Sequence, residues 1–231
     1  MSAVTEVRHA SAADSAAHLA VHVANVLKEA IARRGRATLA VSGGSTPALL
    51  FDRLSELPLD WARVTIAQVD ERWVNAASPD SNQGLIRQHL LKGVARSATF
   101  VPMYDGAPDP SFAQVRYEAF LHSLDGPFDV ILLGMGEDGH TASLFPGAAQ
   151  LEAGLNDPAL CLALDPPAAS HQRLTLSLAG LLHSMLIVLQ IKGTKKEAVY
   201  RDALQAGPVE AMPIRSILRQ DRVPVEVWIS S

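Results

Sequence analysis

The segment with the clearest chemical potential runs from residue 134 to residue 146 and reads GMGEDGHTASLFP. Three glycines among its first six residues allow the backbone to approach a ligand closely. Asp138 and His140 are separated by a single glycine. A histidine near a carboxylate suits general-base catalysis, because the imidazole pKa generally lies near neutral pH. A structural hydrogen bond to a backbone carbonyl is the alternative, but the glycine-rich loop favours a catalytic role for His140.

A second glycine-rich segment, SGGSTP at residues 42–47, follows a short apolar run and precedes a predicted helix. Gly43 and Gly44 permit close approach of the backbone, and Ser45 and Thr46 add hydroxyl groups. The start of a helix also offers unpaired N–H groups and a partial positive charge. These features predict a phosphate-binding loop, although neither a Walker loop nor a G-x-G-x-x-G pattern is present. A tight turn with an ordinary helix cap is the alternative.

Asp70 and Arg72 follow a predicted strand over residues 64–69. Because residues two apart on a strand share a face, both side chains can point at one ligand above the strand end. The planar guanidinium of Arg72 suits the oxygens of a phosphate. The alternative is a surface ion pair, which would contribute only ~0–1 kcal/mol.

Further basic side chains lie near later strand ends. Arg173 begins a predicted strand, and Lys192, Lys195 and Lys196 surround a glycine where another strand meets its helix. A lysine at that junction can neutralise a phosphate. For any one of the three lysines, a solvated position at a helix start is the alternative interpretation.

Other chemistries lack support in the sequence. His18 and His22 lie four apart on a predicted helix, but no third ligand follows at a usable spacing, so we expect no metal site. The absence of a G-x-S-x-G nucleophile elbow argues against an acyl-enzyme esterase. Cys161, the only cysteine, lies in an apolar run and is expected to be a buried strand residue rather than a nucleophile.

The segments around these loops alternate between helix and strand. We expect helices at 11–34, 81–91, 111–124 and 194–204, and one more that Ser45 or Thr46 caps and that has Pro47 in its first turn. We expect strands at 38–41, 64–69, 98–101, 128–133, 174–176, 185–191 and 223–229, the last as an edge strand. This alternation predicts an α/β, Rossmann-like fold with a mostly parallel sheet flanked by helices on both faces. Ligands bind beyond the carboxyl ends of such strands, where the three loops lie.

Composition narrows the possible partners. The 231 residues carry a net charge of −4, which gives no general attraction for nucleic acid or an anionic membrane. No signal peptide is evident, and the longest apolar stretch, 178–191, is too short to cross a bilayer. Neither a repeat nor a low-complexity linker divides the chain. We therefore expect one cytoplasmic domain over residues 1–231, acting on a small molecule as a monomer or a small homo-oligomer.

Taken together, these segments resemble the 6-phosphogluconolactonase family. Ser81–Asn82, Arg173–Leu176 and Met212–Pro213 extend the similarity in the same order, from about residue 38 to the C-terminus. The resemblance implies a fold like that of glucosamine-6-phosphate deaminase. It also implies hydrolysis of 6-phospho-D-glucono-1,5-lactone to 6-phospho-D-gluconate, the second step of the oxidative pentose phosphate pathway, without a metal or an organic cofactor.

The resemblance assigns the base to His140, matches the family's Asp-x-Arg pair to Asp70 and Arg72, and favours Lys196 as its lysine. Lys192 departs from the family pattern, which usually has a neutral residue there.

A mechanism follows in which the 43–46 loop, Arg72, Arg173 and a lysine from 192–196 anchor the phosphate. His140 activates the water that attacks C1. Backbone N–H groups of Gly134 and Gly136 are candidate donors to the developing oxyanion. Either Asp138 or Asp70 orients the imidazole or the sugar hydroxyls.

The sequence also leaves two alternative functions, a glucosamine-6-phosphate deaminase and a non-catalytic sugar-phosphate sensor. Glucosamine-6-phosphate deaminases share the Asp-Gly-His segment but follow it with Ala-Phe-Asn-Glu-Pro, whose glutamate takes part in ring opening. Here Phe145 stands in place of that glutamate and cannot transfer a proton. A sugar-phosphate sensor would keep the phosphate loop and lose the base, which the retained His140 disfavours.

Overall fold

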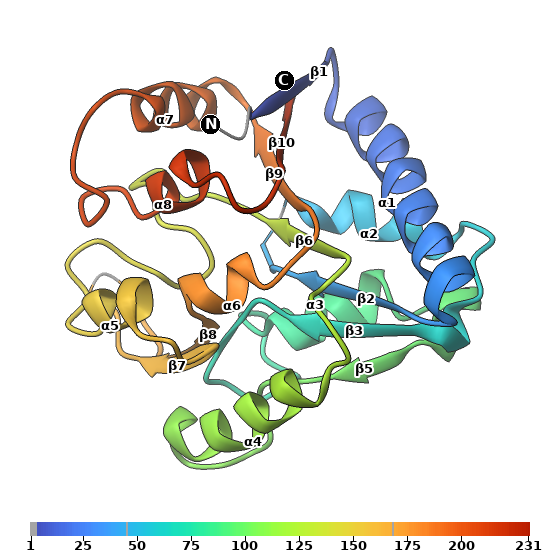
Figure 1. Ribbon diagram of the computed structural model, residues 1–231, viewed down its shortest axis with the longest axis horizontal. Helices are drawn as coiled ribbons and strands as arrows, with labels where there is room; N and C mark the ends of the chain where they lie inside the picture. Colours follow the sequence, from blue (N-terminus) through green and yellow to red (C-terminus); the bar gives the residue numbers. More distant parts are fainter. Residues whose placement is uncertain (1–3, 45, 168) are drawn as a thin grey trace.

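The computed structural model describes residues 4–44, 46–167 and 169–231. Its centre is a seven-stranded sheet in the order β1-β10-β9-β6-β2-β3-β5, in which every neighbouring pair is parallel (Figure 1). The strands are β1 (Thr5–His9), β2 (Ala37–Val41), β3 (Val64–Gln68), β5 (Thr99–Val101), β6 (Val130–Leu133), β9 (Ile187–Lys192) and β10 (Val225–Ser230). The predicted α/β fold with a mostly parallel sheet is confirmed.

Two separate apolar cores show that helices cover both faces of this sheet. Successive strand residues alternate between the cores, as Leu39 and Ala40 of β2 do. One core contains apolar side chains of α1 (Ala12–Arg34), α2 (Pro47–Ser55) and α3 (Asn82–His89). The other contains those of α4 (Pro110–Ser123), α5 (Leu151–Asn156), α6 (Leu178–Leu182), α7 (Thr194–Leu204) and α8 (Ile214–Arg219).

Strand order reverses between β2 and β6. From β2 the chain proceeds to β3 and β5 on one side, whereas from β6 it proceeds to β9 and β10 on the other. A crevice opens at such a switch point because the loops after the two central strands diverge. The glycine-rich segments at 42–46 and 134–140 are those two loops.

A second sheet has three antiparallel strands in the order β4-β8-β7. They are β4 (Asp70–Arg72), β8 (Arg173–Leu176) and β7 (Cys161–Leu164). The predicted strand at 174–176 therefore belongs here and not to the parallel sheet. Cys161 is fully buried, and burial raises the pKa of its thiol far above the ordinary value, which fits the predicted structural role.

Local signals located most of the elements. Ser11 accepts a hydrogen bond from the Asp14 N–H at the start of α1, and Gly35 ends that helix in the left-handed conformation. The prediction that 223–229 forms an edge strand is wrong, because β1 pairs with the outer side of β10. The TEVRH segment of β1 is polar and largely exposed, so it carries little strand signal of its own. None of the helices in the described ranges has both the length and the apolar character needed to cross a bilayer.

Candidate active site

A cavity of about 240 Å³ lies at the carboxyl ends of the central strands. It joins loops that are distant in sequence: one after β2, one after β6, strand β4, and the first turn of α7. Its lining includes Ser42, Gly43, Gly44, Asp70, Arg72, Asn82, Gly134, Met135, Gly136, His140, Ala142 and Lys196. Most of the residues predicted from sequence thus share one cavity.

His140 is held from two sides. Its Nδ1 lies 2.5 Å from Oδ1 of Asp138, and its backbone N–H donates to the same oxygen over 3.1 Å. The ring stacks on Phe145 with the centroids 4.1 Å apart. Because Nδ1 is engaged by the carboxylate, Nε2 is the ring nitrogen available to the cavity.

The charge on Asp138 is stabilised by this contact. Burial acts to raise the pKa of the Asp138 carboxyl, but hydrogen bonds from the His140 ring and backbone outweigh that effect and leave the pKa below its ordinary value. Asp138 is therefore ionised at neutral pH and fixes the orientation of the imidazole. Between the two aspartates left open by the sequence, Asp138 is the one that contacts His140.

Gly136 gives the histidine its space. A Cβ at this position would lie 2.1 Å from Nδ1 of His140 and 2.5 Å from Oδ1 of Asp138, so only glycine fits beneath the pair. The N–H of Gly136 donates to the His140 carbonyl oxygen over 2.9 Å. That N–H is therefore engaged within the loop, which argues against its predicted role as an oxyanion donor. Gly134 keeps that candidate role, and nothing lies within 4 Å of a Cβ placed on it.

Asp70 has different partners. Its Oδ2 accepts a 2.7 Å hydrogen bond from the Ser143 hydroxyl, and its backbone carbonyl accepts one from the Asn82 amide over 2.9 Å. Asp70 is only 7% exposed but borders the cavity. Asn82 also explains Gly43, since a Cβ there would lie 1.8 Å from Oδ1 of Asn82.

Glu71 positions the strand that carries both predicted ligands. It is fully buried and accepts hydrogen bonds from the side chain of Gln68 and from the backbone N–H groups of Arg72, Asn82 and Gln83. Burial raises the pKa of this carboxyl, and the hydrogen bonds oppose that rise only in part. Because strand residues alternate, Glu71 points inward while its neighbours border the cavity.

The basic side chains near the cavity differ in whether they line it. Arg72 and Lys196 line the cavity. Arg173 is the cross-strand partner of Arg72, is only 7% exposed, and has no described partner for its Nε and Nη1. Its burial and the charge of Arg72 lower the pKa of this guanidinium. Adjacent arginines without a carboxylate ion pair among the described residues favour an anionic ligand.

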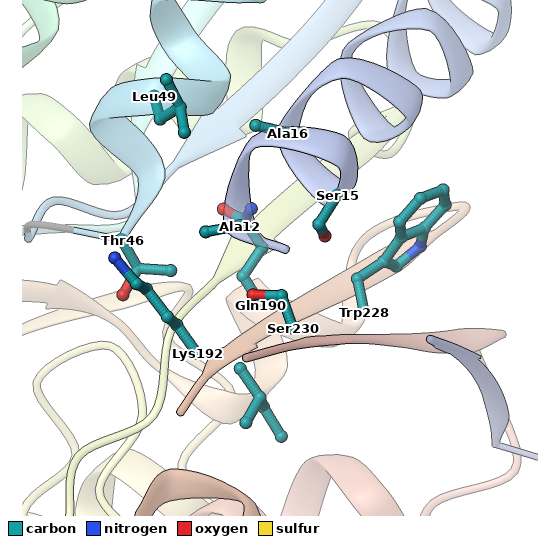
Figure 2. Close-up of a pocket in the computed structure, with 10 residues that line it drawn as sticks. Ala12, Ser15, Ala16, Thr46, Leu49, Gln190, Lys192, Trp228 and Ser230 are labelled. Carbon is teal, nitrogen blue, oxygen red and sulfur yellow. The ribbon is translucent and has the colours of Figure 1, made fainter. Parts of the chain in front are cut away.

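The residues of the predicted phosphate-binding loop line two different pockets. Gly43 and Gly44 line the cavity, whereas Thr46 and Lys192 line a smaller neighbouring pocket (Figure 2). Thr46 occupies the N-cap position of α2 but makes no side-chain capping bond there. Ser45 lies outside the described residues, so its predicted role stays a prediction.

Two further predicted ligands lie away from the cavity surface. Arg173 pairs with Arg72 across β8 and β4 but is not among the residues that line the cavity, so its predicted contact with the phosphate stays a prediction. Lys195 is exposed and lines neither this cavity nor the neighbouring pocket.

Sequence reasoning overlooked four residues that shape the site: Glu71, Asn82, Ser143 and the stacking role of Phe145. Glu71 and Asn82 had a usable signal, because polar residues next to a predicted strand end and a helix start commonly pair there. Within the described ranges, no group of three or more His, Cys, Asp or Glu side chains is placed to hold a metal ion.

Comparison with known proteins gives this cavity a family context. The sequence model described as "Glucosamine-6-phosphate isomerases/6-phosphogluconolactonase" matches residues 10–227, which include all the cavity residues named above. The chain belongs to this family. Within it, a 6-phosphogluconolactonase from Pseudomonas aeruginosa is 44% identical over 211 residues, covering 90% of this chain and 89% of that protein. One from Mesorhizobium japonicum is 46% identical over 213 residues, covering 91% and 88%.

Solved structures agree with the fold. A 6-phosphogluconolactonase from Shewanella baltica superposes with a TM-score of 0.97 at 41% identity, covering 99% of this chain and 98% of that one. A monomeric glucosamine-6-phosphate deaminase superposes with a TM-score of 0.82 at 20% identity, covering 98% and 97%. The second similarity concerns the fold alone. It agrees with the predicted likeness to the deaminase fold.

Proposed function

We propose that this member of the family hydrolyses 6-phospho-D-glucono-1,5-lactone to 6-phospho-D-gluconate, and thus acts as a carboxylic ester hydrolase. One observation carries the proposal: His140 and the cationic pair Arg72 and Lys196 border the same cavity. A phosphorylated lactone needs both a group that activates water and a separate anchor for its phosphate. Relatives named 6-phosphogluconolactonase with more than 40% identity support the same substrate.

In the proposed reaction, the phosphate binds Arg72 and Lys196, beside the backbone of Gly43 and Gly44. Anchoring the remote phosphate converts binding free energy into orientation of the lactone carbonyl near His140. Nε2 of His140 removes a proton from water as the water oxygen attacks C1. Asp138, hydrogen-bonded to Nδ1, stabilises the imidazolium that forms.

The tetrahedral intermediate then collapses. Its oxyanion is stabilised by backbone N–H donors of the 134–136 segment, for which Gly134 is the candidate. The bond from C1 to the ring oxygen breaks, and the His140 imidazolium returns its proton to that oxygen as it leaves. We assign Asp70, held by Ser143 and Asn82, to binding the sugar hydroxyls rather than to orienting the base.

Deaminase chemistry receives no support from the site. The position at which deaminases of the family carry a glutamate is Phe145, and its ring lies against the imidazole of His140. An aromatic ring there excludes water from one face of the base but can neither donate nor accept a proton. The site therefore has the base for water attack without the second acid that ring opening needs.

A titration tests the proposed reaction directly. The lactone is added to the enzyme in a pH-stat, and acid release is compared with spontaneous hydrolysis and with glucosamine 6-phosphate as an alternative substrate. We expect enzyme-dependent acid release from the lactone and no ammonia from the amino sugar. Ammonia release would support a deaminase, and neither product would support a sensor.

The wider setting is also proposed. The match over residues 10–227 is consistent with one catalytic domain spanning the chain. We further propose that the enzyme acts in the cytoplasm, within the oxidative pentose phosphate pathway, as a monomer or a small homo-oligomer. No nucleic acid, membrane, metal or organic cofactor is required by the proposed reaction.

A further inference from the structure

A second polar pocket lies beside the catalytic cavity, at the carboxyl ends of β9 and β10 and beneath the first turn of α1 (Figure 2). Five polar side chains line it: Ser15, Thr46, Gln190, Lys192 and Ser230. None of them takes part in the proposed lactone reaction. The remaining lining consists of Ala12, Ala16, Leu49, Ile191 and Trp228.

Strand geometry places the polar groups together. Gln190 and Lys192 are two residues apart on β9 and share a face. On β10, Trp228 pairs with Gln190 and Ser230 pairs with Lys192. Val188, the preceding residue on the same face of β9, belongs to the apolar core under α1. The apolar pattern of this face therefore changes to polar at the pocket.

Burial makes these polar side chains unusual. Ser15 is 4% exposed, Gln190 is 7% exposed and Ser230 is 8% exposed. No hydrogen bond joins the side-chain polar atoms of these three residues to another residue in the described part of the chain. All three residues line the pocket, so their polar groups reach it without a hydrogen-bond partner among the described residues. Such groups can hydrogen-bond to a polar occupant of the pocket.

The charge in the pocket selects the kind of occupant. Among the described residues of the lining, Lys192 is the only ionisable one, and it forms no ion pair with a described residue. Figure 2 shows its side chain running from the end of β9 toward Thr46. Lys192 is exposed at the end of β9. Its ammonium group, beside hydroxyl and amide groups and with no carboxylate among the described lining residues, complements a small oxyanion and repels a metal cation.

The volume of the pocket limits the size of its ligand. The pocket has a volume of about 40 Å³, which is room for about three water molecules. A compact oxyanion fits there with part of its surface facing solvent, whereas a sugar ring does not. We propose that the pocket formed by Ser15, Thr46, Gln190, Lys192 and Ser230 is a second anion site, which binds free inorganic phosphate independently of the catalytic cavity.

Trp228 makes the proposal measurable. The chain contains three tryptophans, and only Trp228 lines this pocket. Trp61 is buried in the core and serves as the internal reference, whereas Trp73, next to Arg72, reports on the catalytic cavity. With fluorotryptophan in all three positions, the ¹⁹F resonance of Trp228 is followed while sodium phosphate replaces sodium chloride at constant ionic strength.

We expect the Trp228 resonance to shift saturably with inorganic phosphate while the Trp61 resonance stays in place. Lys192→Gln should raise the dissociation constant for phosphate ~10-fold or more, since a charge-assisted hydrogen bond is lost. Gln190→Leu should also raise the dissociation constant for phosphate. Lys195→Gln is the matched control, because this exposed neighbour lines neither site, and it should leave the titration unchanged. An unmoved Trp61 resonance verifies that each variant is folded.

Lys196→Gln distinguishes this site from the catalytic cavity, so the result does not depend on the proposed lactone hydrolysis. The Trp228 titration should survive Lys196→Gln, and glucose 6-phosphate at the same concentration should fail to reproduce it. A shift that does not saturate, or that is unchanged by Lys192→Gln, would overturn the proposal. So would a shift lost with Lys196→Gln, or an equal shift with glucose 6-phosphate.

Discussion

Nδ1 of His140 and Oδ1 of Asp138 lie 2.5 Å apart, in a loop of three residues that also brings the His140 backbone N–H to the same carboxylate oxygen. The proposed general base and its proposed orienting group are thus two residues apart in sequence and contact each other within one loop. Other parts of the fold add Arg72 and Lys196 to the lining of the same cavity.

Replacing the base should remove most of the catalysis without unfolding the protein. We expect His140→Ala to lower kcat roughly 10²–10⁴-fold, the range typical of a lost general base. His183→Ala is the matched control, since that exposed side chain makes no described contact with the cavity. Steady-state kinetics with circular dichroism of both variants provide the measurement. A kcat within twofold of wild type would exclude His140 as the base.

Removing the orienting charge should reduce activity and alter acid stability. We expect Asp138→Asn to lower kcat roughly 10²-fold, because the imidazole is no longer held in its productive orientation. The net effect of burial and of the His140 hydrogen bonds leaves the folded-state pKa of Asp138 below 3.8. Ionised Asp138 therefore stabilises the folded protein at pH values above its ordinary pKa. This stabilisation is lost as the pH falls through the lower pKa of the folded state.

Denaturant unfolding at several pH values checks this sign. The difference in the free energy of unfolding between wild type and Asp138→Asn should be larger at about pH 5 than below about pH 4. A difference that grew on acidification would mean that the carboxyl is protonated more easily in the folded state, contrary to the observed contacts.

Two glycines of one loop offer a matched comparison. Gly136→Ala places a Cβ 2.1 Å from the His140 ring, so the imidazole must move or the loop must open. Gly134→Ala meets nothing within 4 Å and keeps its backbone N–H. We expect the first variant to lose about 10²-fold in kcat, as a displacement of about 1 Å at a catalytic group does, and the second to stay near wild type. Equal kcat values for both would refute the packing argument.

Phosphate anchoring predicts a substrate-dependent effect. Arg72→Gln and Lys196→Gln should each lower kcat/KM for the phosphorylated lactone about 10–100-fold, since each removes a charge-assisted hydrogen bond. Both should leave kcat/KM for unphosphorylated gluconolactone nearly unchanged. Lys195→Gln is the control for general charge effects. If both substrates lost activity equally, these cations would act on the fold or on the reacting carbon, and not on the phosphate.

The buried carboxylate behind the cavity should matter for stability. Glu71→Gln puts an amide NH₂ among the N–H donors of Gln68, Asn82 and Gln83, so that buried donors lose their acceptor. We expect the free energy of unfolding to fall by about 2–4 kcal/mol and Tm to fall by about 5–15 °C. Glu56→Gln, at an exposed position, should change neither. Calorimetry that found Glu71→Gln as stable as wild type would show that the donors find other partners.

The sequence by itself determined the chemical groups and the loops that carry them. Glycine-rich segments at strand ends, a capping serine at residue 11 and apolar runs such as 128–133 are local signals, because neighbouring residues set their conformation. They were sufficient to predict the α/β class, the two loops at the strand-order reversal and the grouping of His140 with Arg72. The same local reasoning placed 223–229 at an edge, since it did not detect the polar β1 strand that covers it.

Only the tertiary structure decided which of several similar side chains reach the cavity. Asp138 and Asp70 have equivalent chemistry, and so do Lys192, Lys195 and Lys196. Their roles depend on distances between segments far apart in the chain, which the sheet order and the small antiparallel sheet impose. The fold places Lys196 in the same cavity as His140 and Lys192 in the neighbouring pocket, because a strand end and the first turn of the following helix present their side chains in different directions.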